Sequence, residues 1–381
     1  MKVLVIILAF LPALAAAEMP TQWIEPATGH RVVRLSGEEG ATKLYFHQNA
    51  FTESGDKLLI RAADGPATVD MKTYKIESLE IGRAGGGFVV GEKSRQVYYW
   101  RNGTVLATHL DTHATREIGR LPPEIRDGGF AVNADESLLA GSYVEAGTLP
   151  RRSGGKKPSL ETRWAAHLPM RLYTVAIKTG KVKTFAPSTE WLNHVQFSPT
   201  EPSLVMFCHE GPWHKVDRIW TIRTDGSRLQ KIHARTMDME IAGHEFFAPD
   251  GKTVWYDLQT PRGKEFWLAG RVLGSEDAIR YKVERELWSV HYNISPDGKQ
   301  FAGDGGGPHS VAAPGNGQWL YLFTPQNGTL HAEKLVDLSK HDYRLEPNVN
   351  FTPDGKWIVF QANMHGKAHV YAVEVAKGKR P

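Results

Sequence analysis

The stretch Phe351-Thr-Pro-Asp-Gly-Lys-Trp-Ile-Val-Phe360 is typical of a strand, a tight turn and a second strand. The Pro-Asp-Gly triplet sets the turn, and the β-branched and aromatic residues after it favour an extended conformation. The same frame recurs along the chain. Fuller copies are Ile294-Ser-Pro-Asp-Gly298 and Phe247-Ala-Pro-Asp-Gly251, and shorter or degenerate copies cover 197–200, 132–136, 90–94 and 51–55.

These seven copies indicate the fold class. Their Ser/Thr-type positions fall at 52, 91, 133, 198, 248, 295 and 352, which are 39 to 65 residues apart. That interval suits about four short strands in each repeat. The sequence therefore predicts an all-β, seven-bladed β-propeller. The last repeat ends at 370–375 and lacks one strand. We expect the N-terminal strand Arg31-Val-Val-Arg-Leu35 to supply it and close the ring, which leaves no exposed sheet edge.

The N-terminus has the features of a secretory signal. A short basic start, Met1-Lys2, precedes an apolar run to Leu14 and then the small residues Ala15-Ala16-Ala17. This pattern is typical of a cleavable signal peptide, and it is too short for a stable membrane anchor. We expect residues 1–17 to be removed and residues 18–381 to form a single propeller domain. The mature protein is then predicted to be secreted or periplasmic, without a membrane anchor.

Composition narrows the range of partners. The formal net charge is +4, a mild basic excess that suits an acidic ligand and is too small to favour nucleic acid. Cys208 is the only cysteine, so no intramolecular disulfide can form. The long third interval contains an insertion, 146–169, which fits a rim loop or lid as well as a disordered excursion. The sequence gives no indication of the oligomeric state.

The repeat also defines a ring of equivalent positions. In a propeller the innermost strand of each blade runs along the central channel, so equivalent residues surround that channel. Four residues before each Ser/Thr-type position, the sequence has Gln48, Gly87, Gly129, His194, His244, His291 and Asn348. A single histidine at a strand start is more often a packing residue than a functional one. Three histidines on consecutive blades are hard to explain by packing, and we interpret them as a functional site that the two glycines leave open.

Two polar segments are predicted to lie near the same channel. Residues 208–218 connect strands of the fourth repeat, and residues 341–348 lead into the last inner strand. Both are dense in charged and aromatic side chains, although a purely structural loop explains each about as well. Trp191, Trp213 and Trp288 are candidates for stacking on the rings of a ligand. The core is the more frequent place for a tryptophan.

The chain resembles the oligogalacturonate lyase family. The residues that carry the resemblance are His209-Glu-Gly-Pro212, Val216-Asp217-Arg218, Gly243-His-Glu-Phe246, His291 before its Ser-Pro-Asp-Gly frame, Thr28-Gly29, Val33-Arg34-Leu35, and Gln48 before Phe51-Thr52. The similarity runs through almost the whole mature chain and is most specific over 191–298. Members of this family are seven-bladed propellers that cleave uronic-acid oligosaccharides by β-elimination, with a divalent metal in the channel.

The resemblance implies a role for individual residues. The family's catalytic base falls on His244, its catalytic arginine on Arg218 and one of its metal-binding histidines on His291. The family's remaining metal ligands come from a Gln…His-Pro-His run, which reads Tyr343…Glu346-Pro347-Asn348 here. Glu346 and Asn348 retain oxygen atoms that bind hard cations. The resemblance thus implies Mn²⁺ on His291, Glu346 and Asn348, with Ca²⁺, Mg²⁺ or no metal as alternatives.

The chemistry of a uronate explains why these residue types belong together. β-Elimination needs a cation to neutralise the carboxylate, a base to take the C5 proton, and protonation of the leaving oxygen; histidine suits the base because its pKa lies near the working pH. His194, His209, Gln48 and Tyr343 are then candidates for binding an acidic oligosaccharide. We predict a lyase of oligogalacturonate type. The alternatives are a lyase of glucuronic-acid glycans, a glycoside hydrolase using Glu210, Glu245 or Glu346, and a non-catalytic binding propeller.

Overall fold

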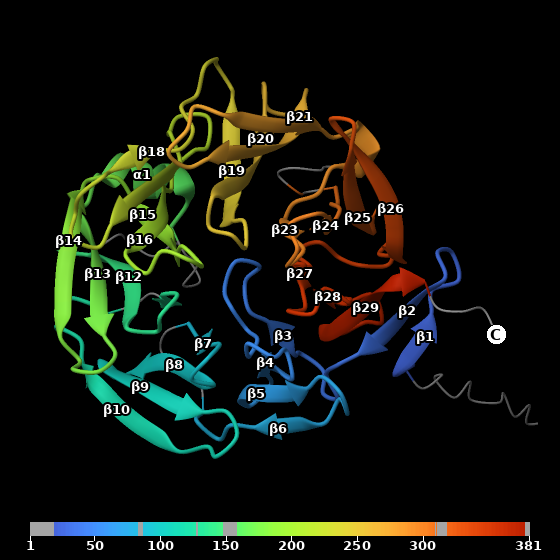
Figure 1. Ribbon diagram of the computed structural model, residues 1–381, viewed down its shortest axis with the longest axis horizontal. Coiled ribbons are helices and arrows are strands. Elements are labelled where there is room, and N and C mark those ends of the chain that lie inside the picture. Colours follow the sequence, from blue (N-terminus) through green and yellow to red (C-terminus); the bar gives the residue numbers. More distant parts are fainter. Residues whose placement is uncertain are drawn as a thin grey trace, which may run out of the picture.

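A computed structural model shows a ring of antiparallel sheets around a central axis (Figure 1). The structure describes residues 19–82, 87–126, 129–147, 158–308, 310 and 318–377. The predicted signal peptide, residues 1–17, lies outside the described residues, and so does part of the predicted insertion, residues 148–157. The assignment of 18–381 to one domain stays a prediction. In the described residues, no helix has the length and apolar character needed to cross a membrane.

The first three blades each contain four strands. Blade 1 consists of β3 (Thr42–Lys43), β4 (Lys57–Ala62), β5 (Gly65–Asp70) and β6 (Ile76–Ser78). Blade 2 consists of β7 (Val89–Gly91), β8 (Gln96–Arg101), β9 (Thr104–His109) and β10 (Thr115–Arg120). Blade 3 consists of β11 (Ala131–Val132), β12 (Leu138–Val144), β13 (Met170–Ala176) and β14 (Val182–Ser188), with helix α1 (Leu160–Ala166) between β12 and β13.

The next three blades repeat this arrangement. Blade 4 consists of β15 (Leu192–Phe197), β16 (Leu204–His209), β17 (Ile219–Arg223) and β18 (Gln230–Lys231). Blade 5 consists of β19 (Ile241–Phe247), β20 (Thr253–Gln259), β21 (Phe266–Val272) and β22 (Ala278–Lys282). Blade 6 follows a 3₁₀ turn, Arg285–Leu287, and consists of β23 (Tyr292–Ile294), β24 (Phe301–Gly303), β25 (Trp319–Gln326) and β26 (Thr329–Asp337).

Blade 7 closes the ring and joins the two ends of the chain. Its inner three strands are β27 (Asn350–Phe351), β28 (Trp357–Ala362) and β29 (His369–Lys377). The N-terminal strand β2 (His30–Arg34) pairs antiparallel with β29, with Val33 opposite Ala372. The predicted seven-bladed propeller and its closing strand are therefore confirmed. A further strand that the sequence reasoning missed, β1 (Gln22–Ile24), pairs outside β2.

The repeated frame works as a hydrogen-bonded turn. In blade 7 the Thr352 hydroxyl donates to the Asp354 carboxylate at 2.6 Å and accepts from the Trp357 amide at 3.1 Å. Gly355 has a φ of 70°, a left-handed conformation that glycine adopts without steric cost. These contacts satisfy polar groups that each turn would otherwise bury. The frame is thus structural, and it fixes the start of the second strand in each blade.

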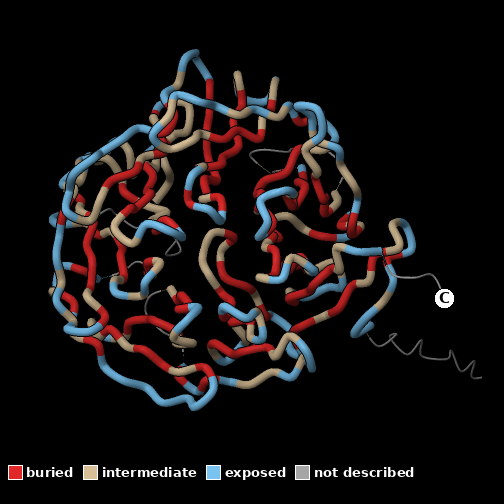
Figure 2. The backbone as a smooth tube through the Cα atoms, viewed as in Figure 1, coloured by how far each residue is buried: buried red, intermediate tan, exposed pale blue. Residues whose placement is uncertain are grey.

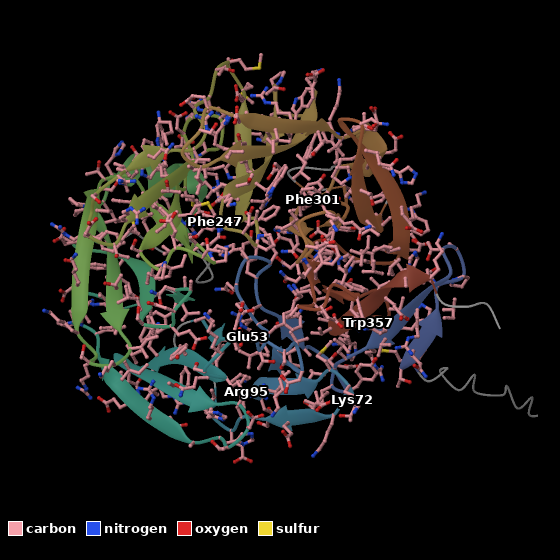
Figure 3. All side chains as sticks on the ribbon, viewed as in Figure 1. Glu53, Lys72, Arg95, Phe247, Phe301 and Trp357 are labelled. Carbon is pink, nitrogen blue, oxygen red and sulfur yellow. The ribbon has the colours of Figure 1, made fainter. Side chains whose placement is uncertain are left out.

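Packing between neighbouring blades supplies the core. Figure 2 shows the buried residues concentrated in the inner strands, whereas the outermost strands are largely exposed. Phe301 of β24, labelled in Figure 3, lies between blades 5 and 6, with its ring centroid 4.8 Å from that of Trp255. Trp288 is also buried in this part of the core, and its indole donates to the Val283 carbonyl at 2.9 Å. Trp288 is therefore a core residue.

Candidate active site

Three of the predicted ring positions share an unusual backbone conformation. His194, His244 and Asn348 have φ values of 51°, 46° and 56°, in the left-handed region that non-glycine residues seldom adopt. In blades 4 and 5 the pairing of the inner strand with its neighbour also shifts register here, between Asn193 and Gln196 and between Gly243 and Phe246. Such bulges redirect a side chain, and left-handed strain of this kind often accompanies functional positions. The common geometry supports the equivalence predicted from the repeat.

The histidines of blades 5 and 6 form a buried pair. The ring centroids of His244 and His291 are 4.5 Å apart. Each Nδ1 lies 2.8 Å from a buried carboxylate, Asp257 for His244 and Asp304 for His291. A carboxylate at Nδ1 favours the tautomer that carries its proton there, which leaves Nε2 as the acceptor in the neutral ring. Both rings are thereby oriented with Nε2 as the basic nitrogen.

The carboxylate also sets the protonation of His244. Burial opposes the charged form of the ring, but the Asp257 carboxylate and its hydrogen bond outweigh burial and raise the pKa of His244 above its usual value. Asp257 lies on β20, 13 residues after His244, and Asp304 follows β24 at the same spacing from His291. Neither carboxylate was among the predicted site residues. The signal that could have found them was this equal spacing on consecutive blades.

Arg218 forms a buried ion pair with Glu245, the residue after His244. Its Nε donates to the Glu245 carboxylate at 3.2 Å, and the two side chains are 2% and 0% exposed. Burial opposes both charges, but nearby groups of opposite charge raise the pKa of Arg218 and lower that of Glu245. The guanidinium also lies 4.8 Å from the centroid of the Trp213 ring. Its Nη1 is buried and has no hydrogen-bond partner among the described residues, so it is available to an anion.

Trp213 joins Arg218 to the histidine pair. Its ring packs edge-on against His244, with centroids 5.1 Å apart. A Cβ atom on Gly243 would lie 2.4 Å from the Trp213 ring, so glycine is required for this close approach. Trp213 is therefore the candidate tryptophan that lies in the site. Trp191 lies instead under Arg163, whose guanidinium carbon is 5.4 Å from the Trp191 ring centroid.

A segment of blade 1 reaches the same place and was not anticipated. After β3 the chain enters the middle of the ring (Figure 1), where Tyr45, Phe46 and His47 contact the predicted histidines. The Tyr45 hydroxyl lies 3.3 Å from Nε2 of His291, and the ring of His47 lies 5.4 Å from that of His194. Burial holds the pKa of His47 well below its usual value, so this ring is neutral. The aromatic and polar run 45–48 beside a ring position was the available signal.

The predicted cation ligands are only partly assembled. Among the described residues no three His, Cys, Asp or Glu side chains are grouped so that they could hold a metal. Nε2 of His291 nevertheless lies 3.7 Å from a carboxylate oxygen of Glu346. The Asn348 Oδ1 is buried and lacks a hydrogen-bond partner within the described chain. The backbone amide of Asn348 donates to the Asp304 carboxylate, which also contacts His291. One nitrogen and two kinds of oxygen donor fit a divalent cation such as Mn²⁺.

The predicted sugar-binding residues lie in different surroundings. His194 is at the channel, with Nε2 3.8 Å from the Glu210 carboxylate. Gln48 is also at the channel, where its amide nitrogen would be 3.6 Å from a Cβ on either Gly87 or Gly129. The two glycines also approach each other, so they leave less room than expected: a Cβ on Gly87 would lie 3.2 Å from the Gly129 Cα.

The other two predicted sugar-binding residues do not join the histidine pair. His209 packs on Trp220, with ring centroids 5.0 Å apart, and burial lowers the pKa of His209 to about 4. No contact joins it to His244 or His291 within the described parts of the chain. Tyr343 lies behind His291, because its hydroxyl donates to the Asp304 backbone carbonyl at 2.8 Å. This contact supports the carboxylate that orients His291.

A cavity of about 520 Å³ lies toward the opposite, turn-bearing end of the channel. Residues 46–51 form part of its wall, together with frame residues of several blades such as Ser198 and Pro353. The paired histidines, Arg218 and Trp213 do not line it. We place the candidate active site at the histidine cluster, because that is where the basic nitrogens and the unpaired guanidinium nitrogen are found.

Comparison with known proteins gives the family of the chain. The sequence model of a family described as oligogalacturonate lyase matches residues 20–378. The chain belongs to the oligogalacturonate lyase family. This confirms the family that the motifs indicated and, with it, the predicted enzyme class, a carbon–oxygen lyase acting on polysaccharides.

Individual relatives of this lyase agree with the assignment. An oligogalacturonate lyase of Dickeya dadantii is 28% identical, and the alignment covers 92% of this chain and 95% of the relative. An oligogalacturonide lyase of Pectobacterium atrosepticum is 27% identical with the same coverage. A solved oligogalacturonate lyase in complex with manganese is 25% identical, with a TM-score of 0.79 over 93% of this chain and 96% of that one. The Vibrio parahaemolyticus enzyme, at 24% identity and a TM-score of 0.79, has the same fold.

Proposed function

We propose that this lyase cleaves oligogalacturonate by β-elimination in the central channel, with His244 as the base and Arg218 as the carboxylate-binding group. One observation carries the proposal: a histidine oriented by a buried carboxylate packs against Trp213, and so does an arginine whose Nη1 is buried without a partner in the described structure. A uronate offers the two groups that such a site can use, a carboxylate and an adjacent acidic C–H. The manganese complex of a relative and the names of the curated relatives support the same chemistry.

The proposed reaction assigns each step to a residue of this chain. Arg218 binds the substrate carboxylate through Nη1 and stabilises the charge that develops when C5 loses its proton. Nε2 of His244 takes that proton, while Asp257 holds the ring and stabilises the imidazolium that forms. The C4–O bond then breaks, a C4–C5 double bond forms, and the departing oxygen takes a proton from water. His244 returns its proton to solvent, so one glycosidic bond becomes one unsaturated end and one free hydroxyl.

His291, Glu346 and Asn348 are the residues that would hold a divalent cation. Such a cation, when bound, would supply a second positive charge to the substrate carboxylate and so acidify C5. Asp304 fixes the ring of His291 by accepting from Nδ1 and from the backbone amide, each at 2.8 Å. This double contact keeps Nε2 directed toward Glu346 and Tyr45.

Two of the three carboxylates that a hydrolase could use, Glu210 and Glu245, have contacts that do not suit that role. Glu245 is paired with Arg218, and Glu210 is paired with Arg163 at 2.8 Å. Burial opposes the charge of Glu210, but His194 and nearby arginines hold its pKa at about 2. A hydrolase needs a carboxylic acid with a raised pKa as its proton donor. Neither glutamate has that property.

The proposed reaction is tested by identifying its product. Purified wild-type protein, with and without Mn²⁺, is incubated with oligogalacturonate and with glucuronic-acid oligosaccharides, and ultraviolet absorbance together with mass spectrometry reports unsaturated uronate. We expect oligogalacturonate to give that product and His244→Ala to lower kcat by about 10³-fold or more, since the residue is the proposed base. His331→Ala, a change on the outer strand β26, is the matched control. Saturated products would indicate hydrolysis, product from the glucuronic-acid substrate alone would change the sugar, and binding without cleavage would indicate a non-catalytic propeller.

The compartment forms a separate part of the proposal. The sequence of residues 1–17 is that of an export signal, so we propose that the enzyme acts outside the cytoplasm. The N-terminal sequence of the protein purified from its native host tests this directly. A mature protein that begins at Glu18 supports export, and one that begins at Met1 contradicts it.

A further inference from the structure

Helix α1 packs against the segment that carries Glu210 and Arg218. The helix belongs to the described part of the insertion, and the Ser159 hydroxyl caps its start by accepting from the Thr162 amide at 3.1 Å. A Cβ on Gly211 would lie 3.1 Å from the Trp164 ring. Lys215 lies 4.9 Å from the centroid of that ring and pairs with Glu161 at 3.1 Å. These contacts hold the helix against the 210–218 segment.

One residue of this helix reaches a carboxylate beside the site. Arg163 donates from Nη1 to Oε2 of Glu210 at 2.8 Å, and the same oxygen accepts from the Asn193 amide nitrogen at 2.7 Å. The side chains of Arg163 and Glu210 are only 14% and 12% exposed. The other oxygen of Glu210 faces His194 at 3.8 Å. Glu210 is thus held by three neighbours, of which Arg163 is the permanent cation.

The backbone beside Glu210 is hydrogen-bonded to that of Arg218. The backbone amide of His209, the residue before Glu210, donates to the Arg218 carbonyl at 2.8 Å. The charges of Glu210 and Arg218 influence each other, in agreement with this proximity. Among the described residues, only Nε of Arg218 bonds a carboxylate, that of Glu245. The buried Nη1 of Arg218 has no hydrogen-bond partner there. After Glu245, which already pairs with Nε, Glu210 is the second carboxylate whose charge acts on this guanidinium.

We infer that Arg163 is a positioning residue that holds Glu210 away from Arg218 and so keeps Arg218 Nη1 free for the substrate carboxylate. The inference rests on the proposed function, because it takes an acidic sugar as the ligand of Arg218. Without Arg163, the Glu210 carboxylate would lose its ion pair in a site with little exposure. It would then compete with the substrate for Arg218 and repel the incoming uronate. The insertion in blade 3 is by this argument a determinant of affinity for acidic substrates.

A set of four variants separates this role from simple docking of the helix. Arg163→Gln removes the cation, Arg163→Lys keeps it, and the double variant Arg163→Gln with Glu210→Gln removes the competing anion as well. Lys215→Gln is the matched control, because it removes a cation from the same helix–loop contact at an exposed position. Circular dichroism and thermal melting first establish that each variant is folded. KM and kcat for trigalacturonate and its Kd by calorimetry are then measured for each protein.

We expect Arg163→Gln to raise KM and Kd about tenfold with kcat changed about twofold at most, because it affects a binding interaction of the ground state. Arg163→Lys and Lys215→Gln stay close to wild type. The double variant recovers most of the lost affinity, because the neutral amide that replaces the Glu210 carboxylate no longer competes for Arg218.

Other outcomes overturn the inference. A double variant as weak as Arg163→Gln would mean that Arg163 only docks the helix, and an Arg163→Gln variant with wild-type KM and Kd would mean that Glu210 does not compete. Binding and cleavage are read separately. A wild-type protein that binds trigalacturonate without forming unsaturated product contradicts the proposed lyase reaction, while its Kd series still decides the role of Arg163. A wild-type protein that does not bind trigalacturonate contradicts both.

Discussion

The two sides of the channel use one structural repeat for different purposes. On blades 5 and 6 the ring position is a histidine. An aspartate in or just after the second strand of the same blade places a carboxylate oxygen 2.8 Å from its Nδ1 in both cases. On blades 2 and 3 the ring position is a glycine, Gly87 or Gly129, and these two lie against each other and against Gln48. On the histidine side, charged carboxylates orient the histidine rings. On the glycine side, the backbones of two blades pack closely together.

This contrast shows where the chemistry of the propeller resides. In blades 6 and 7 the hydroxyl and carboxyl groups of the turn frame serve the turn itself. The candidate active site rests instead on two positions of blades 5 and 6, the ring residue and the residue 13 positions later, which is Asp257 in blade 5 and Asp304 in blade 6. In blade 3 the same step from Gly129 leads to Ser142, whose hydroxyl donates to the Leu192 carbonyl at 2.9 Å. In blade 3 this position therefore bonds a neighbouring strand, whereas in blades 5 and 6 it orients a histidine.

The largest effect should come from removing the carboxylate on the histidine side. Asp257→Asn keeps the shape of the side chain, but its amide can donate to Nδ1 and stabilise the wrong tautomer of His244. It also cannot stabilise the imidazolium by charge. We expect kcat to fall by about 10²-fold or more while the fold is retained. Ser142→Ala, the equivalent change on the glycine side, should leave kcat within about twofold, since it removes one neutral hydrogen bond away from the cluster.

Initial rates of unsaturated product at saturating oligogalacturonate measure both variants, and circular dichroism checks their folding. Equal rates for Asp257→Asn and wild type would show that the Asp257 contact does not serve the base. Similar losses in the two variants would show that the distinction between the two sides is wrong.

A pair of glycine substitutions tests the close packing on each side. Gly243→Ala puts a Cβ 2.4 Å from the Trp213 ring, which also contacts His244. The ring has to move, and we expect a loss of about 1–3 kcal/mol of stability with a lower kcat, as for other overpacked sites. Gly129→Ala meets its nearest neighbour, the Gln48 amide nitrogen, at 3.6 Å, an ordinary contact. In urea unfolding and initial-rate measurements, Gly129→Ala should have nearly the stability and kcat of the wild type. A larger loss of stability or rate in Gly129→Ala than in Gly243→Ala would contradict the comparison.

Cation binding should also belong to the histidine side alone. Glu346→Gln replaces a charged oxygen donor beside Nε2 of His291 by a neutral one, and we expect the Kd for Mn²⁺ to rise about tenfold, or about 1.4 kcal/mol. Electron paramagnetic resonance of free Mn²⁺ measures this without any turnover. Glu53→Gln, a change in the blade 1 turn labelled in Figure 3, is the control. An unchanged Kd in Glu346→Gln would remove Glu346 from the set of ligands.

The sequence allowed the architecture to be predicted because the repeat is carried by local turn chemistry. In the fuller copies Pro, Asp and Gly specify the turn through contacts within a few residues, and the number of copies gives the number of blades. The ring positions could be predicted for the same reason, since a constant offset from a turn is a constant place on the inner strand. His194, His244 and Asn348 even share their left-handed backbone.

The parts that sequence reasoning missed depend on contacts that are not local. Tyr45 reaches His291 across 246 positions of sequence, from a segment of blade 1 that leaves its own sheet. Arg163 reaches Glu210 from an insertion outside the repeat, and no periodic offset relates the two residues. Asp257 and Asp304 are intermediate cases, because their equal spacing was visible but had meaning only once the histidines were placed. Tertiary contacts of single residues therefore need the folded ring, whereas repeated contacts can be inferred from the pattern.

The smallest expected effect concerns the pH dependence of the Arg163–Glu210 pair at the edge of the histidine side. Burial opposes the charge of Glu210, but His194, Arg218 and Arg163 together hold its pKa at about 2, below the usual value of about 4.3. A lowered pKa in the folded state stabilises the protein above the usual value, and this contribution is lost as the pH falls toward 2. Arg163→Gln should therefore lower the free energy of unfolding by about 1 kcal/mol at pH 7. This difference in stability from wild type should shrink below about pH 4.

Urea unfolding at pH 7 and pH 3.5 measures this difference between Arg163→Gln and wild type. The pair Arg223–Glu201 of blade 4, which is more exposed than Arg163–Glu210, is the control, and Arg223→Gln should change stability by less than about 0.5 kcal/mol at either pH. A cost for Arg163→Gln that is the same at both pH values would assign the loss to packing of helix α1 on Trp191, because packing does not depend on the ionisation of Glu210.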